Sequence, residues 1–262
     1  MKNKKVVIIT GTSSGIGLQT ANYFSDKGYT VYGVALGDYK TDKFTHYVAD
    51  VCDNEKMKAV FEEIYNKEGQ IDIVINNAGI GISGAIEYVS QSDLSKIFDI
   101  NVKAVISISA IAIPYLRLSK GKIINTSSVA APISIPFQAC YSATKSAIEG
   151  FSQALANEVR PQGIKVCCVR PGDTKTGFTS ARIKTEVVND VYGERIKKSI
   201  EKMEKDEQGG TNPIKISKQM YKVAKRKNPP LVCTVGFGYK TLCALTKFLP
   251  KKFVNWIVYK IY

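Results

Sequence analysis

Three side chains that could share one proton lie close together in the sequence: Ser128, Tyr141 and Lys145. A phenol has an ordinary pKa of about 10, so at neutral pH it donates a proton but recovers one slowly. A nearby ammonium group lowers this pKa toward the range where the phenol can act as both acid and base. We therefore expect Lys145 to lower the pKa of Tyr141, Tyr141 to exchange a proton with an alcohol or ketone, and Ser128 to hydrogen-bond the oxygen of that substrate.

A strand and a helix are expected to position these groups. The run 122–126 is short, apolar and β-branched, which predicts a buried strand, and Ser128 follows its end. From 140 to 159 apolar residues recur every four positions, which is the spacing of a helix face. Tyr141 and Lys145 are then one helical turn apart. Such a pair also occurs on ordinary exposed helices, so the interpretation depends on the rest of the chain.

A glycine-rich loop follows the first predicted strand, at residues 5–9. Gly11, Gly15 and Gly17 lie between that strand and a predicted helix at 18–27, where the chain must turn tightly and approach a ligand closely. Amides at the start of the helix would face a pyrophosphate, and the helix dipole favours its negative charge. The loop therefore predicts a dinucleotide site.

Strands and helices alternate along the first two thirds of the chain. This alternation predicts an α/β fold with a parallel sheet and right-handed crossovers. Further strands are predicted at 30–35, 44–49, 71–75, 165–169 and 230–235, and further helices at 57–66, 93–114 and 215–226.

The net charge of +14 is concentrated in the last third of the chain. Residues 1–174 hold 18 basic and 16 acidic residues, a balance of +2, whereas residues 175–262 hold 19 and 7, a balance of +12. No acidic residue follows Glu207. Such a distribution is typical of a solvated basic face or of attraction to an anionic surface.

Composition excludes several classes of site. His46 is the only histidine, so neither a His-rich metal site nor a hydrolase triad built on another imidazole is expected. The six cysteines show no C-x-x-C spacing and have apolar neighbours, which predicts buried free thiols in a reducing compartment. No apolar run reaches eighteen residues, so no transmembrane helix is predicted, and the apolar run near the N-terminus is too short for a secretory signal.

Read together, these motifs resemble those of the short-chain dehydrogenase/reductase family. The resemblance covers about residues 4–180, keeps the order of the family's motifs and has its thirteen-residue step from Ser128 to Tyr141. The motifs that carry it are Gly11-x-x-x-Gly15-x-Gly17, Asp50-Val51, Asn76-Asn77-Ala78-Gly79, Asn101, Ser128, Tyr141-x-x-x-Lys145 and Pro171-Gly172-x-x-x-Thr176.

The resemblance implies a doubly wound, Rossmann-like sheet of seven strands and an NAD(P)(H) cofactor. It implies that Tyr141 is the acid/base, that Lys145 lowers its pKa and holds the nicotinamide ribose, and that Ser128 orients the substrate oxygen. It implies that Asn101 supports a water linking Lys145 to solvent. The cofactor contacts that it implies are Gly11, Ser13, Ser14, Gly15, Ile16 and Gly17 near the phosphates, Leu36 near the adenosine ribose, Asp50 and Val51 at the adenine, Asn77, Ala78 and Gly79 along the groove, and Pro171, Gly172, Thr174 and Thr176 at the nicotinamide end.

The end of the second predicted strand bears on the choice of cofactor. Ala35 and Leu36 stand where such folds often carry an acid for the ribose of NAD or an Arg for the 2′-phosphate of NADP. Because Ala35 carries no negative charge, it would not repel a 2′-phosphate, and the sequence favours NADP(H). If Asp38 folds back onto the ribose, NAD(H) is favoured instead. The residues that could reach the phosphate are Ser13, Ser14 and Lys40.

The last third of the chain is expected to choose the substrate. We predict one domain over 1–262, with a core at 4–180, a substrate flap and basic helix at 177–228 and a tail at 237–262. The flap, at 177–212, is predicted to be charged and mostly helical. The tail mixes apolar and aromatic residues with five lysines and no acid, so it either packs over the active site or a second subunit, or lies on an anionic membrane.

The expected function is an oxidoreductase that interconverts a secondary alcohol and a ketone on a hydrophobic substrate, such as a steroid, a retinoid or a lipid. One alternative is a membrane-associated ketone reductase of a lipid pathway, of the acyl-dihydroxyacetone phosphate type. Another is a non-catalytic dinucleotide sensor. Nucleic-acid binding is disfavoured, because the first 174 residues are nearly neutral and no known module is present. We expect a cytoplasmic protein, or one peripheral to a membrane, and the resemblance implies a homo-oligomer.

Overall fold

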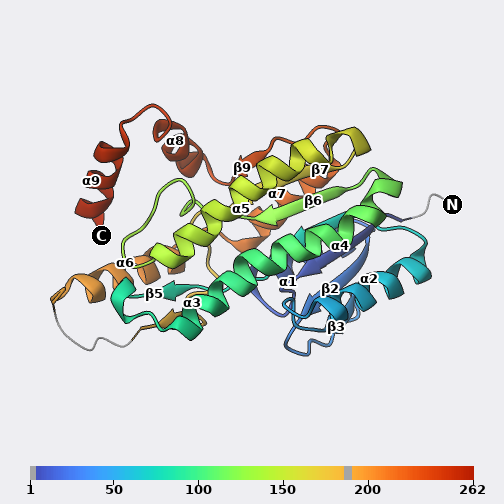
Figure 1. Ribbon diagram of the computed structural model, residues 1–262, viewed down its shortest axis with the longest axis horizontal. Helices are drawn as coiled ribbons and strands as arrows, with labels where there is room; N and C mark the ends of the chain where they lie inside the picture. The colour runs from blue at the N-terminus through green and yellow to red at the C-terminus, as the bar shows by residue number, and fades with distance from the viewer. Residues whose placement is uncertain (1–3, 186–190) are drawn as a thin grey trace.

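Seven parallel strands form the central sheet of the protein (Figure 1). A computed structural model describes residues 4–185 and 191–262. The strands lie in the order β3-β2-β1-β4-β6-β7-β9. Their bounds are β1 Val6–Thr10, β2 Thr30–Ala35, β3 Thr45–Val48, β4 Ile73–Asn76, β6 Lys122–Thr126, β7 Lys165–Arg170 and β9 Val232–Thr234.

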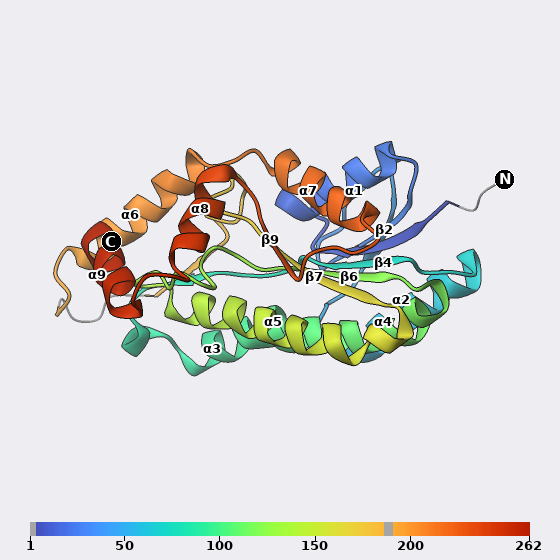
Figure 2. The ribbon, with the colours of Figure 1, turned by 90° about the horizontal axis from the view of Figure 1, so that it is seen from above.

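Helices cover both faces of this sheet, which is seen nearly edge-on in Figure 2. Helices α1 (Gly15–Asp26) and α7 (Pro213–Lys225) lie on one face, and α2 (Asn54–Glu68), α4 (Ala104–Ser119) and α5 (Ala139–Glu158) lie on the other. Because successive side chains of a strand point to opposite faces, β1 contributes to both cores. Val6 and Ile8 pack in one hydrophobic cluster, and Val7 and Ile9 in the other. The predicted α/β fold class is therefore confirmed.

The strand order reverses between β1 and β4. From β1 the chain proceeds outward to β2 and β3, whereas β4, β6, β7 and β9 follow on the other side. The loops that leave β1 and β4 therefore diverge, and in doubly wound sheets ligands bind in the crevice that opens there. Both Gly11 and Asn77 lie at this point.

The long predicted helix at 93–114 consists of three parts: α3 (Gln91–Phe98), a π-helical turn (Asp99–Lys103) and α4. In the described part of the chain, Gln91–Ser119 is the one helix long and apolar enough to cross a membrane by length and composition. Ile97, Ile108 and Leu116 on its inner face are fully buried in the protein, as in a core helix. The homo-oligomer that the resemblance implies remains a prediction.

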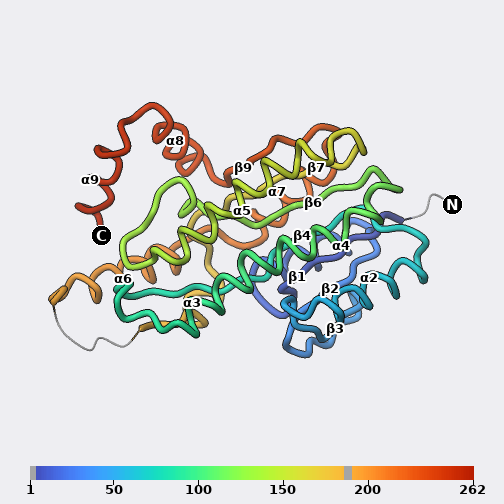
Figure 3. Tube along the Cα trace, in the orientation of Figure 1, coloured from blue at the N-terminus to red at the C-terminus, as the bar shows by residue number. Residues whose placement is uncertain are grey.

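Apart from α7 and β9, the segments after β7 gather at one end of the sheet, as the trace in Figure 3 shows. They comprise a short strand β8 (Ile183–Lys184) paired with β5 (Ile82–Ser83), then α6 (Arg195–Gln208), α8 (Phe237–Leu245) and α9 (Lys251–Ile261). Short helical turns lie at Ile86–Tyr88 and Arg160–Gln162. The predicted flap thus contains one long helix and one short strand, and its residues 186–190 lie outside the described residues.

All six cysteines are free thiols, but not all are buried. Four of them lie in the interior, Cys233 is partly exposed and Cys52 is exposed. The prediction was wrong for Cys52, because this residue lies in the turn between β3 and α2, where its amide donates to the Asp50 carboxylate at 2.9 Å.

Candidate active site

A cavity of about 350 Å³ occupies the crevice at the carboxyl ends of the strands. Seventeen predicted cofactor contacts and the three residues proposed to exchange the proton line it, with Tyr141 and Lys145 counted in both groups. These residues are Gly11, Ser13, Ser14, Gly15, Ile16, Leu36, Asp50, Val51, Asn77, Ala78, Gly79, Ser128, Tyr141, Lys145, Pro171, Gly172, Thr174 and Thr176. Of the residues predicted for the site, only Gly17 and Asn101 are absent from this lining among the described residues.

Ser128, Tyr141 and Lys145 meet in this cavity. Helix α5 begins at Ala139, so Tyr141 lies in its first turn and Lys145 in the next. The Lys145 Nζ atom is 5.6 Å from the centre of the Tyr141 ring and donates a hydrogen bond to the Thr126 carbonyl at 3.0 Å. Ser128 hydrogen-bonds the Tyr141 hydroxyl. A strand end and a helix start therefore hold the three groups together.

The pKa of Tyr141 differs from the sequence-based expectation. Burial raises this pKa to about 12, and the hydrogen bond from Ser128 and the charge of Arg182 only partly oppose the increase. Lys145 does not offset this increase in the pKa of Tyr141, because its own pKa of about 8 leaves the amine uncharged at the pH where Tyr141 titrates. At neutral pH Tyr141 is therefore protonated and can act as an acid.

Lys145 is itself perturbed. Lys145 is only 5% exposed, and this burial lowers the pKa of its amine to about 8. Burial disfavours the charged form of a lysine, so the ammonium is present below pH 8 and is lost as the pH rises through that value. The group is thus poised to change charge close to the physiological range.

This titration predicts a pH dependence of catalysis. If the Lys145 ammonium is required, kcat/KM for ketone reduction should be constant between pH 6 and 7 and fall to about a tenth near pH 9, since kcat/KM reports ionisations of the free enzyme. Tyr141 stays protonated across this range. A kcat/KM profile from pH 6 to 10, with folding checked by circular dichroism at each pH, tests this. A flat profile would contradict a role for the charge.

Asn101 lies in the π-helical turn and is almost fully buried. Its side-chain amide donates to the Ile80 carbonyl at 2.9 Å and to the Thr144 hydroxyl at 3.2 Å, while its oxygen accepts from the Ile80 amide at 2.9 Å. The side chain therefore connects the loop after β4 to α5, beside Lys145. The predicted support of a water by Asn101 remains a prediction.

Gly17 lies behind the glycine-rich loop rather than at the cavity. A Cβ atom at this position would be 2.0 Å from the Gly11 carbonyl oxygen and 2.5 Å from the Asn77 amide nitrogen. The side chain of Asn77 in turn donates to the Thr10 carbonyl at 3.1 Å. Gly17 thus permits close packing of α1 against the loops, which is one of the known uses of glycine in such motifs.

The nucleotide half of the cavity fits a dinucleotide. Gly11 and Gly15 have φ angles of 73° and 56°, in the left-handed region that favours glycine. A Cβ atom on Gly11 would be 2.8 Å from the Ala78 Cα atom. Ser14 precedes α1 and makes no capping hydrogen bond, and the first turn of α1 has no acidic residue, so the helix dipole favours an anion there.

The end of β2 shows which residues could meet a 2′-phosphate. Ala35 and Leu36 line the cavity, but Asp38 and Lys40 lie at a separate surface depression. This part of the β2–β3 loop is held against α1, since Ser25 donates to the Lys43 carbonyl at 2.5 Å. Neither Lys40 nor Asp38 lines the cavity among the described residues, and their predicted contacts with the 2′-phosphate or the ribose remain predictions.

The substrate side of the cavity has walls that sequence reasoning missed. Phe178 packs against Tyr141, with ring centres 5.7 Å apart. Met203 from α6 and Tyr262 lie further along the wall. Two carboxylates, Asp173 and Glu207, also line it, and Glu207 is paired with the buried Arg182. No local pattern marks these residues, because they reach the cavity only through the packing of the last third of the chain.

Comparisons with known proteins agree with this geometry. A family model described as short chain dehydrogenase matches residues 5–187. The chain belongs to this family. The short chain dehydrogenases are oxidoreductases, which is the reaction class that the cavity and its tyrosine suggest.

Similar proteins extend the match to nearly the whole chain. This short chain dehydrogenase is 38% identical to a 3-ketodihydrosphingosine reductase of Bacteroides thetaiotaomicron, over 96% of each chain. The crystal structure of a short-chain dehydrogenase from Streptomyces avermitilis, 28% identical, superposes with a TM-score of 0.84 and covers 95% of this chain and 93% of its own. The structure of ElxO with NADP bound, 25% identical, has a TM-score of 0.74 and covers 91% of this chain and 99% of its own.

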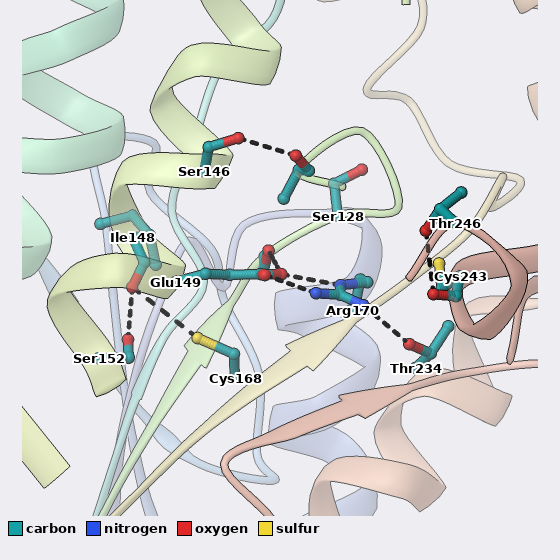
Figure 4. Close-up of polar contacts among 12 residues, drawn as sticks. Ser128, Ser146, Ile148, Glu149, Ser152, Cys168, Arg170, Thr234, Cys243 and Thr246 are labelled. Atoms are coloured by element: carbon teal, nitrogen blue, oxygen red, sulfur yellow. Dashed lines mark hydrogen bonds and ion pairs between the residues drawn. The ribbon is translucent and has the colours of Figure 1, made fainter. Parts of the chain in front are cut away.

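A buried ion pair supports the catalytic end of this short chain dehydrogenase (Figure 4). Arg170, at the end of β7, donates to both carboxylate oxygens of Glu149 on α5, at 2.8 and 2.5 Å. The Ser127 hydroxyl donates to the same carboxylate at 2.6 Å. Glu149 lies one turn beyond Lys145. The pair therefore joins the segment that carries Ser128, the helix that carries Tyr141 and the strand that leads to Pro171.

A tyrosine from α8 reaches the same loop. The Tyr239 hydroxyl donates to the Asp173 carboxylate at 2.5 Å. A Cβ atom on Gly172 would lie 2.2 Å from the Tyr239 ring, so no larger residue fits there without displacing the ring. Helix α8 is thereby seated directly on the loop that lines the cavity.

Proposed function

We propose that this short chain dehydrogenase reduces a ketone on a long-chain, lipid-like substrate to a secondary alcohol, with NADPH as the hydride donor. The observation that carries the proposal is the cavity itself, in which a protonated Tyr141 faces an apolar wall. The similarity to a 3-ketodihydrosphingosine reductase over nearly the full length of both chains supports the lipid character of the substrate. This choice favours the lipid-pathway alternative over a steroid or retinoid.

The residues of the cavity have separate roles in this reaction. A bound NADPH would supply the hydride that adds to the carbonyl carbon. Tyr141 donates its proton to the carbonyl oxygen, so that the ketone becomes an alcohol and no alkoxide is left. Ser128 hydrogen-bonds the same oxygen and orients it toward the phenol. The phenolate that forms is stabilised by the Lys145 ammonium, which gains importance in a site with little water.

An apolar chain can follow the wall that leads away from Tyr141. Phe178, Met203, Ile135 and Tyr262 offer rings and methyl-bearing side chains along this side of the cavity. Burial of each methylene of a substrate against such a wall contributes about 0.8 kcal/mol. A substrate with a long chain therefore gains more binding free energy here than a small polar sugar does.

Cofactor preference gives a testable prediction at Ala35. Replacement Ala35→Asp should lower kcat/KM with NADPH relative to NADH by about 10–100-fold, since a carboxylate near the 2′-phosphate repels it, and tenfold corresponds to about 1.4 kcal/mol. Ala35→Asn is the matched uncharged control and should change the ratio much less. Initial rates with both cofactors measure the ratio. An unchanged ratio in Ala35→Asp would contradict the proposed position of the phosphate.

The substrate proposal is tested with a panel of ketones and spectrophotometric measurement of NADPH oxidation. The panel contains 3-ketodihydrosphingosine, an acyl-dihydroxyacetone phosphate, a 3-ketosteroid and a small keto-sugar. We expect kcat/KM to be highest for a long-chain ketone and to fall when its chain is shortened. Activity confined to the sugar would contradict the proposal, because the apolar wall would then have no role.

A further inference from the structure

The tail, residues 237–262, exposes an unusual amount of apolar surface. Phe237 and Phe248 are 87% and 86% exposed, the largest values among the exposed large hydrophobic residues described. More than half of those residues belong to this one segment, although it forms only about a tenth of the chain. Exposed apolar residues concentrated on one segment in this way commonly mark an interaction site. Its other members are Leu242, Leu245, Phe253, Trp256, Tyr259 and Ile261.

Helix α9 packs on the protein through one side and exposes Phe253 and Trp256 on the other. Its inner side is anchored by the buried Val258 and by contacts with α6, where the Arg195 guanidinium lies 4.9 Å from the centre of the Tyr259 ring. On the outer side, Phe253 and Trp256 stack with ring centres 6.1 Å apart and an interplanar angle of 16°. A helix that only stabilised the fold would bury these rings, so their exposure indicates a partner.

The charge of the tail restricts the chemistry of that partner. Its five lysines are all exposed and are interleaved with the aromatic residues, and the segment has no acid. Aromatic rings at headgroup depth with lysines facing phosphate groups are the pattern of a helix that lies in the surface of an anionic membrane. These lysines are Lys240, Lys247, Lys251, Lys252 and Lys260.

A second copy of the chain fits this surface less well. In a two-fold symmetric contact the same patch meets itself, so the lysines of one copy would approach those of the other. With no acid in the tail, nothing within it could neutralise them. An anionic lipid surface supplies the opposite charge and a layer into which the rings can insert.

The tail also adjoins the proposed substrate site. Tyr262 lines the cavity together with Met203 and Glu207 of α6, and the Lys202 ammonium lies 5.6 Å from the centre of the Tyr262 ring. The views in Figures 1 and 2 both place α9 beside α6, at the end of the molecule opposite the N-terminus. A surface that holds the tail therefore also holds the substrate side of the cavity close to it.

We propose that the tail binds the surface of an anionic bilayer, with the Phe253 and Trp256 rings at headgroup depth, and that this contact presents the cavity to a lipid substrate. The binding itself is independent of the proposed function. Only the delivery of a substrate depends on the proposed function, so membrane binding and turnover of a lipid ketone are tested by separate measurements.

Trp256 is the only tryptophan of the chain and reports directly on binding. The full-length protein is titrated with two kinds of vesicle. One contains phosphatidylcholine alone, and the other contains phosphatidylcholine with about 30% of the anionic lipid phosphatidylglycerol. We expect a blue shift of the Trp256 emission and co-flotation with the anionic vesicles, both weakened by salt. Equal binding to neutral vesicles, or no binding to the anionic ones, would overturn the proposal.

Two variants test the surface, with one matched control. Lys251→Glu/Lys252→Glu should weaken binding to anionic vesicles at least tenfold. Each basic residue near such a surface contributes about 1 kcal/mol, which corresponds to a factor of about five in affinity. Lys4→Glu/Lys56→Glu makes the same change in charge at two exposed lysines outside the tail and should have little effect. Phe248→Ser/Phe253→Ser should weaken binding while Trp256 still reports it.

Activity and oligomeric state complete the test. Turnover of a short soluble ketone should be unchanged in the tail variants, while turnover of a vesicle-borne long-chain ketone falls with binding. If wild type binds vesicles but reduces no lipid ketone, the proposed function fails and the membrane contact stands. If the tail variants instead dissociate a dimer in analytical ultracentrifugation and wild type ignores vesicles, a second copy covers the tail and the proposal is wrong.

Discussion

Replacement of Tyr141 by Phe is expected to reduce the rate of ketone reduction by about 10²–10⁴-fold, the usual contribution of general acid–base catalysis. The variant keeps the ring that packs against Phe178 and loses only the hydroxyl beside Ser128. NADPH affinity, measured by fluorescence titration, should stay within a few fold, because the glycine-rich loop and β2 are untouched. The loss should therefore appear in kcat.

Tyr65→Phe is the matched control for this experiment. Tyr65 lies on α2 and is not among the residues that line the cavity, so turnover should be unaffected. If Tyr141→Phe retains full turnover, Tyr141 is not the acid. If wild type binds NADPH but turns over none of the ketones in the panel, the non-catalytic sensor becomes the better interpretation.

The second large effect is expected at the buried ion pair. Glu149→Leu should lower the free energy of unfolding by about 3–5 kcal/mol, since removing one partner leaves the Arg170 charge buried and uncompensated. Both side chains are about nine-tenths buried, with side-chain exposures of 11% and 10%, so solvent screening is small. Urea denaturation followed by circular dichroism measures the change.

The double variant Glu149→Leu/Arg170→Met separates the charge from the packing. Removal of both charges should restore most of the lost stability, because the desolvation of the unpaired guanidinium is then relieved. Glu55→Gln removes one partner of the exposed Lys58 pair and should have little effect. If Glu149→Leu is as mild as Glu55→Gln, the pair does not hold the catalytic end together. Activity should also fall in Glu149→Leu, through the hydrogen bond from Ser127.

Local sequence predicted the sheet well. The runs 30–35 and 122–126 became β2 and β6 residue for residue, because strands buried on both faces are short apolar runs with polar or glycine boundaries. In these places the fold is determined by neighbours in sequence, and a local pattern suffices.

Features that depend on tertiary packing were beyond local patterns. The raised pKa of Tyr141 reflects how deeply the phenol is buried, which spacing alone does not give. The cavity wall at Phe178 and Met203 and the separate depression at Lys40 depend on how loops fold over distant helices. Gly17 was recognised as part of a motif, but its packing against Gly11 required the coordinates.

Contact between Tyr239 and the Pro171–Asp173 turn has a thermodynamic consequence. The turn lines the nicotinamide end of the cavity, while Tyr239 belongs to α8 and so to the segment that faces outward. A nucleotide that orders the turn would also favour the docked position of α8. If a bound nucleotide raises the affinity of the outer segment for its partner by some factor, then binding of the partner must raise the affinity for the nucleotide by the same factor.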